Sequence, residues 1–374
     1  MRIAALGVVG AAGVAASYFA AGPERFWVNW IVWMLFLASV GLGALFIVAL
    51  EHTFIARWSV PLRRTAERVA GLVVPASIAA VAALGSIHVL YPWAHPEAAH
   101  HPILVAKSAW LNVPFFCART LFCAGVWIFS YRFFLGGSIA QDSSHDPAMN
   151  LRARRFAPVF MALFALTVTV AAFDWMSSLQ PEWYSDIFGV YLFAGVFLSG
   201  LAGVTAAALH LQRGGRLPGV RSDHLYNLGA LMFAFTVFWS YIAFSQYMLI
   251  WYGNLPEEIV WYQNRIQGRW LPVILFLAAI HFVVPFIALA TRDAKQDARR
   301  LRWVAWLVLF SHWVDLYWLV YPELGIGPRF SWPELSFALM FVCLGLAWMK
   351  RQLTLGEDMP VGDPFLKEGL GFRL

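Results

Sequence analysis

Long apolar stretches recur along this chain at short intervals, and they constrain its fold more than any other feature. A helix needs roughly 20 mostly apolar residues to cross the hydrocarbon core of a membrane. Because that core offers the backbone no hydrogen-bond partners, a spanning segment must be helical. We predict an all-α integral membrane protein with about ten transmembrane helices, at 3–22, 27–50, 72–92, 110–135, 156–175, 184–211, 224–251, 270–291, 303–321 and 332–349.

The composition supports a membrane protein, since 60% of the residues are apolar and 13% are charged. A soluble domain is nearer half apolar and a quarter charged. Most Lys and Arg residues lie in connections on one side of the predicted membrane, which the positive-inside rule identifies as the cytoplasm. Both termini are then cytoplasmic, with 136–155 as a cytoplasmic loop and 351–374 as a cytoplasmic tail. The net charge of +6 is loop charge of this kind, so we expect no nucleic-acid partner.

A repeated spacing divides the predicted single membrane domain, 1–374, into parts. Pro96-Glu97 precedes Trp110 by the same interval as Pro256-Glu257 precedes Trp270, and Asp174 and Asp315 each lie seven residues before a Pro-Glu pair. We therefore predict two leading helices and a loop in 1–71, then four-helix bundles in 72–212 (helices 3–6) and 224–350 (helices 7–10). Four spans per unit give the two copies the same orientation, as in a parallel repeat.

Cysteine is too sparse in this sequence to hold a redox cluster. The three cysteines, Cys117, Cys123 and Cys343, all lie in predicted helices and form no C-x-x-C motif or set of four. We expect no iron–sulfur cluster in this chain, no structural metal, and small apolar packing roles for the three thiols.

Ionisable side chains within membrane spans are costly, so each is a candidate functional residue. The candidates here are His88, Arg119, Asp174, Tyr241, Gln246, His281, His312 and Asp315. His312 and Asp315 are three residues apart and share one helix face. His281 is predicted at a similar depth on the preceding helix.

This set of residues suits a proton pathway or a quinone pocket. In a proton pathway, His281, His312 and Asp315 would form the inner part and Asp174 and His88 the outer part. The same groups could hydrogen-bond a quinone ring, or simply pair with each other across helices. A haem b with His281 and His312 as axial ligands is a further alternative, although the neighbouring Asp315 suits proton chemistry better.

Several segments resemble one family of membrane subunits. They are Ala56–Arg64, Phe173–Leu179, Phe188–Tyr191, Phe233–Tyr247, Leu249–Tyr252, Asn254–Glu258, His281–Phe286 and His312–Val320. Together they resemble the ActF subunits of alternative complex III, a bacterial quinol:cytochrome c oxidoreductase of the inner membrane. The resemblance spans roughly residues 30–323 and includes the related NrfD and polysulfide-reductase membrane anchors.

The resemblance implies a respiratory function in which partner subunits carry the electrons. The implied partners are an iron–sulfur protein, multihaem and monohaem cytochromes c, a sister NrfD-like quinone-binding subunit and membrane lipids. Menaquinone or ubiquinone is the implied ligand, with no covalently bound cofactor and no haem in this chain. Two other functions fit the sequence: a secondary transporter with charged groups near the midplane, and a purely structural membrane anchor.

Overall fold

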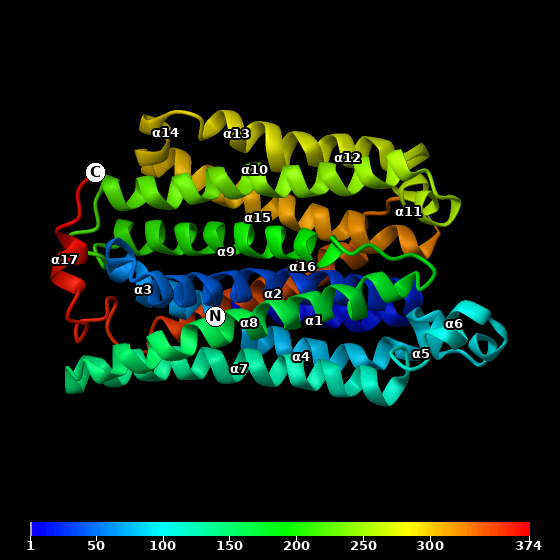
Figure 1. The fold of residues 1–374 in the computed structure, drawn as a ribbon, viewed down its shortest axis with the longest axis horizontal. Coiled ribbons are helices and arrows are strands. Elements are labelled where there is room, and N and C mark those ends of the chain that lie inside the picture. Colours follow the sequence, from blue (N-terminus) through cyan, green and yellow to red (C-terminus); the bar gives the residue numbers. More distant parts are fainter. Residues whose placement is uncertain (1, 326) are drawn as a thin grey trace.

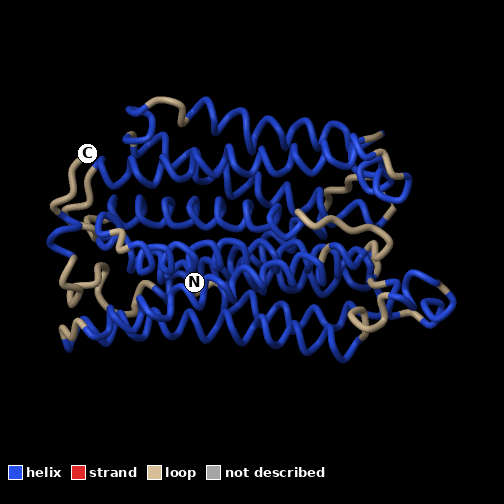
Figure 2. Tube along the Cα trace, viewed as in Figure 1, coloured by secondary structure: helices blue, strands red, loops and turns tan. Residues whose placement is uncertain are grey.

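The computed structural model describes residues 2–325 and 327–374, and its helices run roughly along one common axis (Figure 1). Ten helical segments in this part of the chain are long and apolar enough to cross a membrane, and each overlaps a predicted span. The described residues form no β-strand, and loops gather at the two ends of the molecule (Figure 2). The all-α multi-span fold is therefore confirmed.

Eight of these described spans are built around one main helix each. They are α1 (Arg2–Ala21), α2 (Pro23–Phe54), α7 (Val113–Ser144), α8 (Ala148–Trp175), α9 (Phe188–Arg213), α10 (Ser222–Gly253), α15 (Ala298–Val320) and α16 (Trp332–Gln352). The other two are assembled from shorter pieces. The third contains α3 (Val60–Ala70), α4 (Val73–Ala83) and α5 (Ile87–Leu90), and the eighth contains α12 (Leu271–Leu277), a π-helical segment η7 (Ala278–Val283) and α13 (Val284–Ala288).

The two ends of the bundle differ in what covers them. At one end, called the tail end below, residues 353–374 with α17 (Leu366–Leu370) pack on α3, and α14 (Arg292–Gln296) lies at the same end. At the opposite end lie α5, α6 (Pro102–Ala106) and α11 (Pro256–Ile266) (Figure 1). The predicted loop 136–155 is wrong, because α7 continues to Ser144 and α8 begins at Ala148. A helix can extend beyond the apolar core when its polar side chains find partners. Hydropathy alone therefore predicts helices that are too short.

The helices α2 and α9 form the centre of the molecule. Both are largely buried, whereas most of α1 is exposed and packs on α16 at the periphery. A Cβ on Gly200 would come within 2.3 Å of the backbone of Gly43, so the two helices cross where both residues lack side chains. The helix α2 also packs against α4 and α8, and α9 packs against α10 and α15. The helices α2 and α9 therefore join the predicted leading helices and four-helix bundles to one another. The internal repeat itself stays a prediction.

Arginines of α3 fasten the tail to the bundle. Arg63 donates to Asp363 at 2.6 Å, and Arg68 donates to Asp358 at 2.7 Å. Asp358 also accepts a hydrogen bond of 2.6 Å from Arg216, which lies in the connection that follows α9. Each of these contacts joins residues far apart in the sequence, so the tail holds three segments together.

The same arginines pair with carboxylates of the bundle. Arg63 donates to Glu51 at 2.9 Å, and Arg64 donates to Glu67 and to Asp142, each at 2.9 Å. The side chains of Arg63, Arg64 and Glu67 are almost fully buried. The sequence predicts a loop for these arginines, and that is wrong because they lie on the helix α3. Their neutralising partners come from α2, α7 and the tail, which local sequence does not reveal.

We predict that Gly200→Ala lowers the stability of the protein. A methyl group there meets the backbone of Gly43, and overpacking of this kind costs about 1–3 kcal/mol. Thermal unfolding of the purified chain in detergent measures the effect as a lower Tm. The matched control is Gly136→Ala, because a Cβ on Gly136 has open space around it. That change should leave the Tm unchanged or raise it slightly, since alanine is the better helix former.

We also predict that acid releases the tail. Burial alone raises the pKa of Asp358 and of Asp363, but hydrogen bonds and charge from Arg216, Arg68 and Arg63 outweigh it and lower both pKa values. A carboxyl group with a lowered pKa stabilises docking above its ordinary pKa, and the contribution is lost as the pH falls through the lowered value. Tail docking should therefore persist at neutral pH and weaken below about pH 4.

Fluorescence anisotropy of a dye attached after Leu374 reports this release during an acid titration. Arg216→Gln removes one cation beside Asp358, so its pKa falls less and release should move to higher pH. An anisotropy that is the same from neutral to strongly acidic pH in both proteins would contradict the role of these pairs.

Candidate functional site: a buried histidine–aspartate cluster

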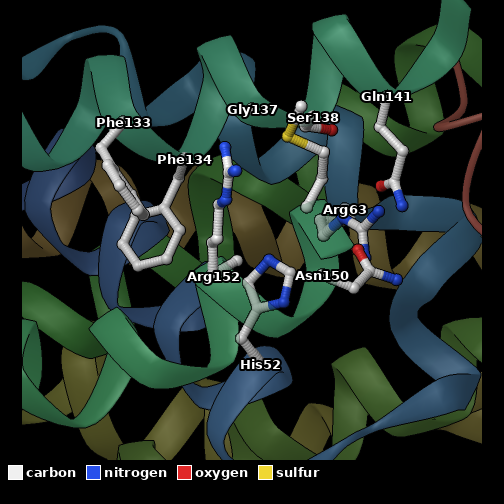
Figure 3. Close-up of a pocket in the computed structure, with 11 residues that line it drawn as sticks. His52, Arg63, Phe133, Phe134, Gly137, Ser138, Gln141, Asn150 and Arg152 are labelled. Carbon is white, nitrogen blue, oxygen red and sulfur yellow. The ribbon is translucent and has the colours of Figure 1, made fainter. Parts of the chain in front are cut away.

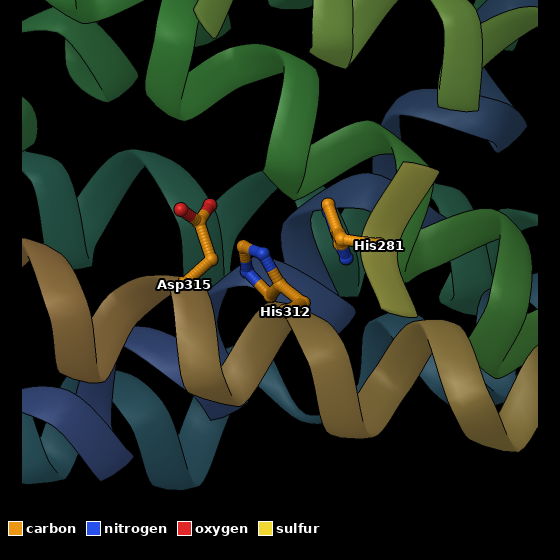
Figure 4. Close-up of side chains that lie close together, drawn as sticks. All are labelled: His281, His312 and Asp315. Carbon is orange, nitrogen blue, oxygen red and sulfur yellow. The ribbon is translucent and has the colours of Figure 1, made fainter. Parts of the chain in front are cut away.

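The helix α15 carries two of the predicted site residues on one face. His312 and Asp315 are each 1% exposed and lie less than one turn apart on an unbroken helix. His281 of the neighbouring eighth span is fully buried, and one ligand-type atom from each of the three side chains lies within 4.8 Å of the others. Figure 4 shows the imidazole of His312 between Asp315 and His281. The predicted grouping of these three residues is therefore present in the structure, and they are called the His–Asp cluster below.

His281 lies in the π-helical segment η7, and the local sequence explains why the helix changes there. Pro285 follows His281 by four residues and has no N–H for the carbonyl group of His281. A π turn widens the helix so that a carbonyl group bonds to the residue five positions on. The turn leaves the imidazole facing α15, where Nδ1 contacts Oγ of Ser311. Such interruptions within helices are frequent at functional sites.

Two aromatic side chains hold the carboxylate of Asp315. The hydroxyl group of Tyr191 on α9 donates to Oδ1 at 2.7 Å, and Nε1 of Trp239 on α10 donates to Oδ2 at 3.1 Å. The sequence predicts an imidazole partner or water for Asp315 and does not single out these two donors. Both nevertheless belong to segments that carry the family resemblance, so the signal was present in Phe188–Tyr191 and Phe233–Tyr247.

Asp315 differs from the other buried carboxylates that the structure describes. Each of the others pairs with an arginine, namely Glu51, Glu67, Asp174, Glu334 and Asp363. Asp315 has only neutral donors, and no Lys, Arg or His nitrogen lies within 4.0 Å of its oxygens among the described residues. An unpaired carboxylate in a membrane span is expensive unless it is protonated or hydrated. Asp315 is therefore the buried acid best placed to exchange a proton.

The histidines of the cluster keep free ring nitrogens. Within the described part of the chain, neither nitrogen of His312 makes a hydrogen bond, and Nε2 of His281 makes none. A buried polar atom without a partner is uncommon and calls for an explanation such as a bound water or a chemical role. Separations of at most 4.8 Å between the cluster atoms are within reach of a bridging water, which makes two hydrogen bonds of about 2.8 Å.

One alternative for His281 and His312 is a haem b with these two axial ligands. Their ring centroids are 6.3 Å apart, but the indole of Trp239 lies against His281 with centroids separated by 4.1 Å. On the other side, a Cβ on Gly195 would come within 2.7 Å of Cε1 of His312. A porphyrin or a quinone ring needs a broad flat slot, and backbone and indole occupy that space. The packing therefore disfavours either ring inside the His–Asp cluster.

The cluster also has the residue types that bind divalent metals, with two imidazoles and one carboxylate. Both carboxylate oxygens, however, already accept hydrogen bonds from Tyr191 and Trp239. An ion would have to share one of these oxygens while it drew the ligands to about 2.0–2.2 Å. The geometry observed favours proton exchange among the three groups, and the sequence prediction of no metal in this set stays a prediction.

Arg119 and Asp174 form a separate site and pair with each other. Arg119 donates to both carboxylate oxygens at 2.6 and 3.0 Å, and its guanidinium group lies over the Trp110 ring at 4.2 Å. Nε1 of Trp110 also donates to Asp174 at 3.1 Å. This carboxylate is therefore fully satisfied, and of the two roles that the sequence allows, the arrangement favours a structural link between α7 and α8.

The remaining predicted residues lie apart from both sites. His88 is exposed near the opposite end, where Nδ1 contacts the carbonyl oxygen of Ala94 at 3.2 Å. Tyr241 is 62% exposed on the outer surface of α10. Gln246 is buried on the same helix, about two turns beyond Trp239, and makes no hydrogen bond to the His–Asp cluster among the described residues.

The opposite end contains two more buried ion pairs that the sequence reads as surface charge. Arg265 contacts Glu323, and its guanidinium group lies 3.7 Å from the centroid of the Trp261 ring. Arg25 donates to Glu334 at 2.7 Å. The sequence predicts that Glu323 lies in a solvated loop, and this is wrong because the short α11 folds back over the end of α15 and brings Arg265 to it.

A comparison with protein-family models finds no match to this chain, and a comparison with curated proteins finds none either.

We predict that Arg119→Gln destabilises the protein because it leaves Asp174 buried without its cation. Loss of one member of a buried ion pair costs about 3–5 kcal/mol. The double variant Arg119→Gln/Asp174→Asn removes both charges and should recover much of the lost Tm. Arg132→Gln is the control, since Arg132 is exposed on the same helix. If the double variant melts no higher than the single one, the charge pair is not the source of the stability.

Proposed function

We propose that this chain is a membrane subunit of a respiratory quinol:cytochrome c oxidoreductase of the alternative complex III type. Its part in the complex is to conduct protons through the His–Asp cluster. The observation that carries this proposal is the buried Asp315. Among the described residues it accepts hydrogen bonds only from Tyr191 and Trp239, and it lies beside two imidazoles with free nitrogens. The segments that resemble the ActF subunits include all five of these residues, which links the geometry to the family.

The geometry of the cluster supports a stepwise movement of protons. Protonated Asp315 releases its proton through a water to a free nitrogen of His312, and His312 passes a proton to Nε2 of His281 in the same way. His281 contacts Ser311 through Nδ1, so a hydroxyl group continues the line. Tyr191 and Trp239 stabilise the carboxylate of Asp315 after the proton leaves, because both donate to its oxygens.

Partner subunits supply the electron chemistry in this proposal. Oxidation of a quinol yields a quinone, two protons and two electrons, and the three cysteines described in this chain are separate and unbonded. The close packing of Trp239 and Gly195 against the histidines disfavours a quinone ring in the cluster, so we assign quinol binding to the sister NrfD-like subunit. An iron–sulfur protein and haem-containing cytochromes c then carry the electrons to the acceptor.

We place the subunit in a bacterial inner membrane with the tail end in the cytoplasm. The support is the distribution of Lys and Arg, which concentrates in the segments that lie at the tail end. Several of these arginines pair with carboxylates in the folded protein. The positive-inside rule acts during insertion and counts Lys and Arg while Asp and Glu contribute little, so the pairing leaves the assignment intact.

Specific observations also favour two other functions. A secondary transporter is supported by the π-helical interruption at His281, since transporter sites form where spanning helices are broken. A structural anchor is supported by the way Asp315 ties α15 to α9 and α10. The transporter requires no cytochrome partners, so co-purification tests it. The anchor requires no exchangeable proton at Asp315, so a variant at this position in an intact assembly tests it.

We predict that Asp315→Asn assembles normally and loses function. Asparagine keeps the shape and can still accept from Tyr191 or Trp239, but it cannot release a proton. A complex purified through a tag on the C-terminal tail should contain haem-bearing subunits at the level of the unmodified protein. Its quinol:cytochrome c turnover, or the proton movement linked to it, should fall by about 100-fold, the usual contribution of a positioned proton donor.

The matched control for this experiment is Asp186→Asn, because Asp186 is an exposed carboxylate outside the spans. It should leave turnover and proton release unchanged. Full turnover and proton release in an assembled Asp315→Asn complex would reject the proton role and support the anchor. Recovery of a stable chain without haem-bearing partners from native membranes would reject the respiratory assignment and support the transporter.

A further inference from the structure

A cavity of about 190 Å³ lies at the tail end between α7 and α8, away from the His–Asp cluster (Figure 3). Its lining combines the aromatic side chains of Phe133 and Phe134 with polar groups of His52, Asn150 and Arg152. A smaller pocket shares His52 and Asn150 and adds Arg154. The chemistry described so far uses none of these residues, so the cavity needs an explanation of its own.

The position of the cavity along α7 corresponds to the level of lipid headgroups. Phe133 lies 20 residues after the first residue of α7, which at 1.5 Å per residue is roughly 30 Å, the thickness of a hydrocarbon core. A hydrocarbon core that begins near the start of α7 therefore ends before the part of α7 that lines the cavity. This argument holds whichever side of the membrane the tail end faces.

Most polar groups inside the cavity already have partners. Asn150 donates to Asp363 at 2.9 Å, and Arg63 is paired with Glu51 and Asp363. The guanidinium groups of Arg152 and Arg154 differ, since no hydrogen bond or ion pair involves them among the residues that the structure describes. Arg152 lines the cavity, and Arg154 lines the smaller pocket that adjoins it through His52 and Asn150. A free cation in each of two adjoining hollows favours an anionic ligand, and guanidinium groups match phosphate oxygens well.

Apolar side chains continue from the cavity along the outer surface. The rings of Phe129, Phe133 and Phe156 contact one another directly beside it, with centroids 4.5–6.1 Å apart. Farther from the tail end, Phe122 on α7 and Leu166 on α8 are more than half exposed. A ligand with a phosphate group at the rim can therefore lay a hydrocarbon chain on this surface.

We propose that this cavity and the smaller pocket that adjoins it bind the phosphodiester headgroup of an anionic phospholipid. Arg152 reaches the phosphate from the cavity and Arg154 from the smaller pocket, and the acyl chains follow the exposed face of α7 and α8. Basic pockets between spanning helices bind such headgroups in other membrane proteins. The inference does not depend on the proposed respiratory function, because it rests only on the cavity, its free arginines and the apolar face beside it. A soluble phosphate shares the headgroup chemistry but makes no use of that face.

The test measures lipid binding to the full chain after purification and delipidation in detergent. Native mass spectrometry gives the affinity for phosphatidylglycerol and for phosphatidylcholine with the same acyl chains. We expect tighter binding of phosphatidylglycerol, and a loss of about fivefold in its affinity for each arginine removed in Arg152→Gln and Arg154→Gln. Arg155→Gln is the matched control, since Arg155 is exposed on the same helix and lines neither pocket.

Competition with sodium phosphate distinguishes the two sources of the phosphate group. We expect phosphatidylglycerol to stay bound when the concentration of inorganic phosphate far exceeds that of the lipid. Equal affinity for the two lipids, or equal losses in Arg155→Gln and Arg152→Gln, would overturn the site. Ready displacement by inorganic phosphate would assign the cavity to a soluble anion and overturn the lipid. Circular dichroism of each variant confirms that the helices are intact, and both arginines at the rim are accessible enough for folding to tolerate their loss.

Discussion

Charge neutralisation inside a low-dielectric interior is the constraint on which this structure depends. A single buried charge costs several kcal/mol, and only a well-placed opposite charge or hydrogen bonds offset the penalty. The chain meets this requirement with arginine–carboxylate pairs at both ends of its helices, such as Arg119 with Asp174 and Arg63 with Glu51. Most of these pairs join different helices, so the need to neutralise charge also determines which helices are neighbours.

Asp315 is significant because the chain departs from this rule there. Its donors, Tyr191 and Trp239, are neutral, and they leave the charge of the carboxylate uncompensated. An arginine in their place would pair with the carboxylate, as Arg119 does with Asp174. Neutral donors instead allow both the protonated and the ionised form, which is what a group that passes protons needs. The difference between the two aspartates therefore lies in their partners and does not follow from their depth alone.

The spans were predictable from sequence because hydrocarbon requires a long apolar run wherever a helix crosses it. The pairing of His281, His312 and Asp315 was predictable in part, since helical spacing places His312 and Asp315 on one face. The partners of Asp315 were not, because Tyr191 and Trp239 lie on other helices and aromatic residues are common throughout this chain. For the same reason the arginines of α3 looked like loop charge: their carboxylates are distant in the sequence, and hydropathy carries no record of long-range pairing.

The order in which the chain is synthesised determines when the tail can cover α3. Arg63 and Arg68 reach the membrane early, but Asp358 and Asp363 follow them by 290 to 300 positions. At the usual rate of synthesis this separation corresponds to roughly 15–60 seconds. During that interval the third span holds guanidinium groups whose final partners do not yet exist. The arginines of α3 are covered only after the C-terminal segment has been synthesised. A nascent chain interrupted before that point would leave this cationic end of the bundle uncovered.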